Sequence, residues 1–262
     1  MFETISFAVC AWVISVNLHK RKREEDLKYS PFCGKMKKNM RFHFRKAVFS
    51  MKDIPMFTSE YGVASLFLRE IPYRGRAHIK IQSSLDPEKL LEECVSFCRM
   101  CGAEWIDAAG HAYLEKYPLI TALVSMQCSR EQLGDSDACL FPMTEQTMKQ
   151  WLDICNERME HVPNAAFLDA KDGRELLEKG NAYFIHRNGQ LLGIGIASGD
   201  FIDTVVAVQP GAGETVVRAL ASVLVEDTVR LMVADANTRA VRLYERLGFL
   251  KVKELSRWYR VL

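Results

Sequence analysis

Residues 51–138 alternate between apolar and polar positions in short runs, with one helical stretch among them. Strict alternation over four to eight residues predicts half-buried strands. The helical stretch opens at Asp86-Pro87-Glu88, where proline in the first turn and acids at the positive end favour a helix start. The predicted elements, in order, are strands at 64–71 and 76–82, a helix at 86–100, and strands at 104–109 and 119–127.

The second half of the chain carries longer helical stretches and a hairpin. Thr144 is a helix N-cap residue, and apolar positions recur after it at helical spacing. Asn188-Gly189 separates two alternating runs, which predicts a tight hairpin. The predicted elements, in order, are a strand at 139–143, helices at 144–159 and 172–178, strands at 182–187, 191–197 and 201–208, a helix at 214–225 and a strand at 229–233.

The stretch that follows is the most informative in the sequence. Ala240, Leu243, Tyr244 and Leu247 recur at helical spacing and predict a short helix with one apolar face. Gly248 stands where a helix C-cap needs a left-handed residue, and a strand is predicted at 249–255. The run N-x-x-A-x-x-L-Y-E-x-L-G-F, which starts at residue 237, resembles the C-terminal motif of the GNAT acyl-CoA N-acyltransferases.

This resemblance implies a fold class and a division of the chain. The order of elements in 139–262 is that of the GNAT fold, an α/β fold with a mixed sheet. The order in 51–138 is similar to the second half of that fold, so this segment resembles a smaller, degenerate GNAT-like α/β domain. The expected organisation is tandem: a poorly ordered basic extension at 1–50, the degenerate domain at 51–138 and a GNAT acetyltransferase domain at 139–262.

The resemblance also implies a function. It predicts an N-acetyltransferase that moves an acetyl group from acetyl-CoA to a primary amine of a small molecule or peptide by direct attack. The pyrophosphate of the co-substrate is expected at the turn Gly211-Ala-Gly213 and the helix start at Thr215, since backbone N–H groups at a helix N-terminus favour anions. The backbone of Val206 and Val208 is expected to pair with the pantetheine arm.

Some features of this site leave alternatives open. Asn237 is expected either to contact the arm of acetyl-CoA or to cap the helix that follows it. The glycine turn is shorter than the family pattern, lacks its basic residues and is followed by Glu214, which would repel a phosphate. Weakened or lost binding of acetyl-CoA therefore remains an alternative, in which the protein is a catalytically silent GNAT-like binding module.

The expected catalytic residues are Tyr244 and Asp203. Tyr244 would be the general acid that protonates the leaving thiolate, or else a core tyrosine. Asp203, on the strand before the glycine turn, is the available general base. Proton loss through water and His186 are alternatives, although a lone histidine in a hairpin strand is more often structural.

Charge separates the first 50 residues from the rest. They hold 11 Lys and Arg against 4 Asp and Glu, a net charge of +7, while the other 212 residues hold 24 against 29, a net charge of −5. The apolar run from Ile5 to Leu18 is short for a membrane span and is followed by basic residues, which is not the order of a signal peptide. A peripheral membrane anchor stays open. No nucleic-acid-reading motif accompanies the basic cluster.

Eight cysteines are scattered through predicted core elements. Cys94-x-x-x-Cys98-x-x-Cys101 matches the iron–sulfur spacing of radical S-adenosylmethionine enzymes, but the same spacing continues the apolar stripe of the predicted helix. We interpret it as core packing and expect no metal site. Reduced thiols and a cytoplasmic location are expected, and a homodimer is possible.

Overall fold

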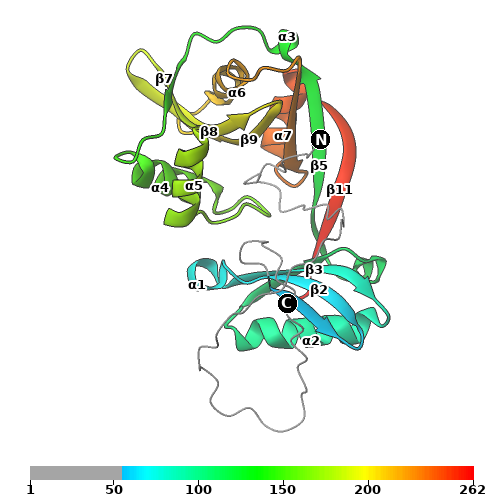
Figure 1. The fold of residues 1–262 in the computed structure, drawn as a ribbon. Coiled ribbons are helices and arrows are strands. Elements are labelled where there is room, and N and C mark those ends of the chain that lie inside the picture. Colours follow the sequence, from blue (N-terminus) through cyan, green and yellow to red (C-terminus); the bar gives the residue numbers. More distant parts are fainter. Residues whose placement is uncertain (1–54) are drawn as a thin grey trace, which may run out of the picture.

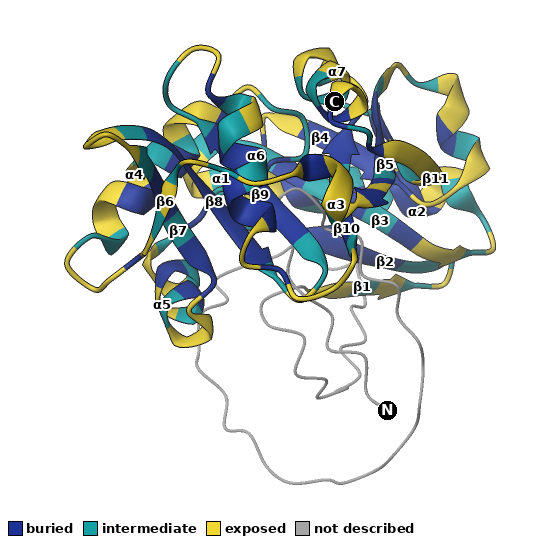
Figure 2. Cartoon of the chain, turned by 90° about the horizontal axis from the view of Figure 1, so that it is seen from above, coloured by how far each residue is buried: buried dark blue, intermediate teal, exposed yellow. Residues whose placement is uncertain are grey.

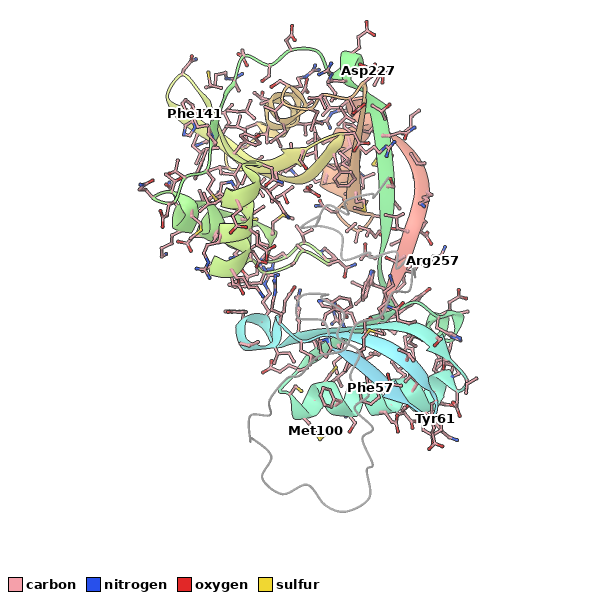
Figure 3. All side chains as sticks on the ribbon, viewed as in Figure 1. Phe57, Tyr61, Met100, Phe141, Asp227 and Arg257 are labelled. Carbon is pink, nitrogen blue, oxygen red and sulfur yellow. The ribbon has the colours of Figure 1, made fainter. Side chains whose placement is uncertain are left out.

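One mixed sheet of 11 strands runs through both lobes of the computed structural model, which describes residues 55–262 (Figure 1). The strand order is β1-β2-β3-β4-β11-β5-β10-β9-β8-β7-β6. β5 and β11 are neighbours in the middle of this order and connect the two lobes. Arg257 on β11 marks the place where that strand passes from one lobe to the other (Figure 3).

The N-terminal lobe holds the first elements of the described chain, with helix α2 packed beneath the sheet (Figure 1). In order they are β1 (Met56–Ser59), β2 (Gly62–Phe67), α1 (Ile71–Arg74), β3 (Arg76–Ser84), α2 (Pro87–Met100), β4 (Trp105–Ala109) and a 3-10 helix η1 (Ala112–Lys116). The next strand, β5 (Leu119–Ser129), runs into the C-terminal lobe and pairs there with β10. Phe57, Tyr61 and Met100 lie on the side of this lobe that faces away from the C-terminal lobe (Figure 3).

The C-terminal lobe carries helices on both faces of its part of the sheet. Its elements are α3 (Arg130–Leu133), β6 (Cys139–Pro142), α4 (Met148–Met159), α5 (Ala170–Lys179), β7 (Ala182–Arg187), β8 (Gln190–Ser198), β9 (Phe201–Ala207), α6 (Gly213–Ala221), β10 (Thr228–Ala234), α7 (Thr238–Arg246) and β11 (Leu250–Arg260). β8 and β9 are buried along most of their length, while the outer faces of α4 and α5 are exposed (Figure 2).

The two lobes repeat one arrangement. Apart from β6, the sheet order reads the same from both ends, as β1-β2-β3-β4-β11 and as β7-β8-β9-β10-β5. The pairings repeat too, because β3/β4 and β9/β10 are parallel while β4/β11 and β10/β5 are antiparallel. Each lobe therefore takes its fifth strand from the other half of the sequence, and β5 lies between β10 and β11.

Local chemistry explains where the helices and turns begin and end. Asp86 caps α2 by accepting a hydrogen bond from the backbone N–H of Lys89, as its position before Pro87 predicts. Asn188 and Gly189 both have positive φ, 52° and 75°, which is the tight hairpin turn that their types favour. Gly248 ends α7 with a φ of 90°, in the left-handed region.

Three apolar cores hold these layers together. α6 and α7 pack on one face of the C-terminal sheet, with Val216, Leu220 and Phe249 in that core. α4 and α5 cover the other face, around the fully buried Trp151. α2 covers one face of the N-terminal sheet, where Cys94 and Cys98 are buried among leucine and isoleucine side chains, so their interpretation as core residues is confirmed. The same interpretation is wrong for Cys101, which is exposed because α2 ends at Met100.

Most predicted elements are present, with differences at their ends. β1 and the short helices α1, η1 and α3 were not expected. β2 ends at Phe67 rather than 71, α6 ends at Ala221 rather than 225, and β11 continues to Arg260 rather than ending at 255. The expectations for residues 1–50 lie outside the described residues. Among the described residues, no helix has the length and apolar character that crossing a bilayer requires.

Candidate functional site

The parallel strands β9 and β10 pair at only two positions, which are the first two residues of β9 and the middle of β10. Phe201 lies opposite Arg230 and Ile202 opposite Leu231, and no further pair follows although the strands continue to Ala207 and Ala234. Beyond that point β9 stays paired with β8, and β10 stays paired with β5. The two strands therefore diverge along 203–207 and 232–234, and we call this region the divergence.

A β-bulge stands where the divergence begins. Ile202 lies opposite Ala197 on β8 and Thr204 lies opposite Ile196, so Asp203 is an extra residue with no paired residue on β8. A bulge bends its strand and increases the local twist. Because Asp203 directly follows the last residue of β9 that pairs with β10, the bulge turns the rest of β9 away from β10.

The same bulge decides which backbone groups of β9 face the divergence. The N–H of Val208 donates to the carbonyl of Leu192 on β8, at 2.8 Å. Since backbone groups alternate in direction along a strand, Val206 also faces β8, while Val205 and Ala207 face the divergence. Val206 and Val208 were expected to present their backbone groups to a ligand, but these groups face β8. The extra residue at 203 shifts the alternation by one, so the groups of Val205 and Ala207 face the divergence instead.

The glycine turn leads directly from β9 into α6. Gly211 has a φ of 82°, and α6 begins at Gly213 without a side chain that caps its first N–H groups. A side chain at Gly213 would lie 2.8 Å from the Leu243 side chain, so this glycine lets α6 pack closely against α7. Uncapped N–H groups at a helix N-terminus are suited to an anion, and Thr215 lies half-buried in the first turn.

The charges around the turn differ from the sequence-based picture. Glu214, expected to repel a phosphate, forms an ion pair with Arg218 at 3.0 Å. Arg158, in the last turn of α4, reaches the carbonyl of Val208 at 3.5 Å. Arg158 could not be predicted as part of this site, because it lies some 50 residues before the turn.

Asn237 and Tyr244 lie on the helix that follows β10. The side-chain oxygen of Asn237 accepts a hydrogen bond from the N–H of Ala240 at 3.2 Å, so the residue does cap α7. A contact with acetyl-CoA stays a prediction and would use the amide NH2 group. Tyr244 is 7% exposed, and its ring lies 5.7 Å from that of Phe249.

Tyr244 belongs to the core cluster between the sheet and the helices α6 and α7. Its core cluster includes Val233 of β10, and Val205 of β9 packs against the same cluster. Asp203 is buried, at 3% exposure, and the neighbouring Thr204 is buried as well. Asp203 is thus buried near the start of the divergence and the glycine turn follows the end of β9, while the chemical roles of Asp203 and Tyr244 stay predictions.

His186 is not part of this arrangement. It lies on β7, which β8 separates from β9, and its ring packs 5.3 Å from that of Phe141. Phe141 marks the outer edge of the C-terminal lobe (Figure 3). The spacing of strands puts His186 about 10 Å from β9, too far for proton transfer at the divergence. Among the described residues, no group of three or more His, Cys, Asp or Glu side chains could hold a metal ion.

Comparisons with known proteins agree with this geometry. Residues 207–259, from the end of β9 through most of β11, match the family model described as FR47-like protein. No curated protein matches the sequence. A functionally unknown conserved protein from Staphylococcus epidermidis has a similar structure, with 13% identity and a TM-score of 0.53, over 79% of this chain and 93% of that one.

A GCN5-related N-acetyltransferase from Anabaena variabilis is similar too, with 11% identity and a TM-score of 0.50. The match covers 76% of this chain and 59% of the Anabaena protein. At such identities the likeness concerns the fold alone. The fold is that of the GNAT acetyltransferases, as the motif at residues 237–249 predicts.

Proposed function

We propose that this protein is an N-acetyltransferase, which moves an acetyl group from acetyl-CoA to a primary amine of a small molecule or peptide. The divergence of β9 and β10 carries the proposal. It leaves the backbone groups of Val205 and Ala207 without a neighbouring strand, and a pantetheine arm has amide groups that can pair with them as a strand would.

The remaining parts fit the same co-substrate. The uncapped N-terminus of α6 suits the pyrophosphate, and Arg158 adds a positive charge near the turn. In the reaction the amine nitrogen attacks the thioester carbonyl and the carbon–sulfur bond breaks. Tyr244 then gives its phenolic proton to the departing sulfur, and Asp203 takes a proton from the amine, directly or through water.

Two assays test the proposal, one for binding and one for transfer. A ligand that binds only the folded state at one hundred times its Kd adds about 2.7 kcal/mol to the free energy of unfolding, which raises the midpoint of a chain this size by about 5–10 °C. We expect that rise with acetyl-CoA, and release of free CoA thiol when a panel of primary amines is added.

An unchanged midpoint in millimolar acetyl-CoA would contradict the proposal and favour the silent binding module. The Glu214 carboxylate beside the turn is the feature that would account for such a result.

A further inference from the structure

Strand β3 presents different chemistry on its two faces. Ala77, Ile79 and Ile81 point into the core under α2. Because side chains alternate along a strand, Arg76, His78 and Lys80 lie on the opposite face. This face is half-buried rather than fully solvated, and burial lowers the pKa of Lys80.

The neighbouring strands extend this face. In the strand register, His78 lies opposite Asp107 of β4, and Asp107 lies opposite Arg260 of β11. Asp107 is 6% exposed and accepts a hydrogen bond from Nε of Arg260, while Nδ1 of His78 lies 3.9 Å from its other oxygen. The guanidinium of Arg260 also lies over the ring of Trp105, 5.0 Å from its centre. Asp107 thus holds the side chains around it in a fixed arrangement.

Positive charge prevails on this surface, which we call the basic face and define by Arg76, His78, Lys80, Asp107 and Arg260. It has three basic side chains (Arg76, Lys80 and Arg260) and one carboxylate, a formal net charge of +2 when His is counted as neutral. A half-buried surface with excess positive charge favours an anion, because interactions between charges strengthen where water is reduced.

Contacts across the sheet link the basic face to the divergence. The ring of Trp258, on the same strand as Arg260, lies 5.7 Å from that of His78. Trp258 is opposite Thr121 of β5, and the Thr121 hydroxyl donates to the carboxylate of Asp235 at 2.8 Å. Asp235 directly follows β10. A short path of contacts therefore leads from the basic face to the end of β10.

The basic face belongs to the side of the sheet that α6 and α7 leave uncovered. Thr121 shares a face of β5 with Leu123, which packs with Met232 and Phe201. Val124, which points the other way, belongs to the core under α6 and α7. The basic face is thus on the side of α4 and α5, and the glycine turn leads into a helix on the opposite side.

Two arginines tie the same side of both lobes together. Arg69 Nη2 donates to the carbonyl of Phe167 at 2.7 Å, and Arg74 Nη1 donates to that of Ala165 at 2.8 Å. The ring of Tyr73 stacks on that of Phe167 with 4.0 Å between centroids. The connection between α4 and α5 is therefore held next to the N-terminal lobe, on the side where the basic face lies.

We propose that the basic face binds the anionic group of the acceptor, so that the acceptor is a small primary amine that also carries a carboxylate or a phosphate. This rests on the proposed N-acetyltransferase function. The phosphates of acetyl-CoA are not the expected occupant, since the turn that suits them begins α6 on the other side of the sheet. The first 50 residues are not either, because their net charge of +7 has the same sign as the face.

The test compares amines that differ only in the anionic group. Glycine is paired with glycinamide and O-phosphoethanolamine with ethanolamine, and CoA release is measured with saturating acetyl-CoA. We expect the anionic member of at least one pair to have a kcat/KM about tenfold higher, the size of one hydrogen bond to a charged group. The pair with the larger preference shows whether the basic face favours a carboxylate or a phosphate.

The variant Arg76→Gln/Lys80→Gln should reduce that preference about tenfold by raising KM for the anionic amine, with kcat and the Kd of acetyl-CoA unchanged. Arg76→Gln alone is the milder variant if the double one unfolds. Arg99→Gln removes an exposed cation from α2, on the other side of the same lobe, and should change nothing.

Acetylation without preference for the anionic amine, or a preference that both variants retain, would overturn the inference while leaving the proposed function intact. Absence of acetyl-CoA binding would instead count against the proposed function. If no amine of the panel is acetylated, calorimetry with the CoA-loaded protein decides: O-phosphoethanolamine must bind and ethanolamine must not, and equal or undetectable binding of the two overturns the inference.

Discussion

The two lobes share one arrangement of strands but differ where a parallel pair could open. In the N-terminal lobe β3 and β4 pair along all five residues of β4, from Trp105 to Ala109. In the C-terminal lobe β9 and β10 pair over only two residues of each strand. Both β3 and β9 have a bulge, but that of β3 falls at Gln82, after the last pair with β4, while that of β9 falls at Asp203. The position of one extra residue decides whether two parallel strands stay together.

The helices that follow β3 and β9 also differ, because the N-terminus of one is capped and that of the other is not. The N-terminus of α2 is closed by the carboxylate of Asp86, which occupies the place where an anion would bind. α6 has no such cap and follows a glycine turn. The N-terminal lobe therefore repeats the architecture while lacking both features that suit it to an acyl-CoA.

The largest effect is expected from separating the lobes. A fragment of residues 139–262 lacks β5, the strand between β10 and β11, whose Val124 and Met126 are buried in the C-terminal core. The loss should exceed the typical stability of a domain, about 5–15 kcal/mol, so the fragment should show no cooperative unfolding by circular dichroism. A fragment of 119–262 keeps β5 and is the matched control. Cooperative unfolding of 139–262 would contradict the shared-strand arrangement.

Proline substitutions should tell the two sides of β9 apart. Val206→Pro removes an N–H that faces β8 and should destabilise the protein by about 3 kcal/mol, measured by urea unfolding. Ala207→Pro removes one that faces the divergence, so it should change stability by less than about 1 kcal/mol and weaken acetyl-CoA binding about tenfold. The reverse ranking would mean that the bulge at Asp203 does not shift the alternation.

The helices after β4 and β10 each carry a tyrosine, which gives a matched pair. Tyr244→Phe should lower kcat about 100-fold, as for loss of a general acid, with little change in the Kd of acetyl-CoA. Tyr113→Phe alters the tyrosine of η1 in the N-terminal lobe and should leave kcat unchanged. Equal kcat for both variants would assign Tyr244 to core packing alone.

The buried cysteines predict a dependence on alkaline pH that is largest for the packing of α2. Burial raises the pKa of Cys94 and of Cys98 from 9.0 to about 12, and that of Cys128, in the core under α6, to about 11. The unfolded chain therefore loses these protons first, so the stability is complete below pH 9 and falls as pH rises toward 12. At pH 10 each thiol should account for a loss of roughly 1.4 kcal/mol.

Urea unfolding between pH 8 and pH 10 measures this loss. Cys98→Ala should reduce the decline by about a third, since Cys94 and Cys128 contribute the rest, while Cys101→Ala, at an exposed thiol, should leave its slope nearly unchanged. A decline of the same size in Cys98→Ala would assign it to other groups.

The smallest effects concern the acids at the two helix starts. Asp86→Ala should cost about 1 kcal/mol of stability by removing the cap of α2. Glu214→Gln removes an exposed charge from α6, so it should change stability little and tighten acetyl-CoA binding about two- to threefold at low salt. Titrations at two salt concentrations check this, since a gain that persists in 0.5 M salt would not be electrostatic.

Local signals in the sequence were enough for most of the elements. The Asn188-Gly189 turn, the cap at Asn237 and the stop at Gly248 all follow from neighbouring residues, so they could be predicted. The same holds for the buried stripe of α2, whose period is visible within one helix. Such features depend on residues a few positions apart.

The features that define the site depend on partners far along the chain. Nothing near Asp203 indicates a bulge, because a bulge exists only relative to β8, and so the phase of Val205 and Ala207 could not be predicted. The position of β5 between β10 and β11 could not be predicted either, because it depends on strands far away in the sequence. The contacts of Arg69 and Arg74 with residues 91 to 98 positions later were equally out of reach.

The strand shared at the junction also bears on the order of events during synthesis. β4 needs residues 259–262 as its neighbour, and the backbone of Ile106 bonds to that of Val261 and Leu262. Asp107 and Arg260 are 153 positions apart, so the ribosome must add that much chain before this edge of the sheet is covered. The lobe that emerges first is thus completed last, and until then its exposed edge is open to chaperones or to a neighbouring nascent chain.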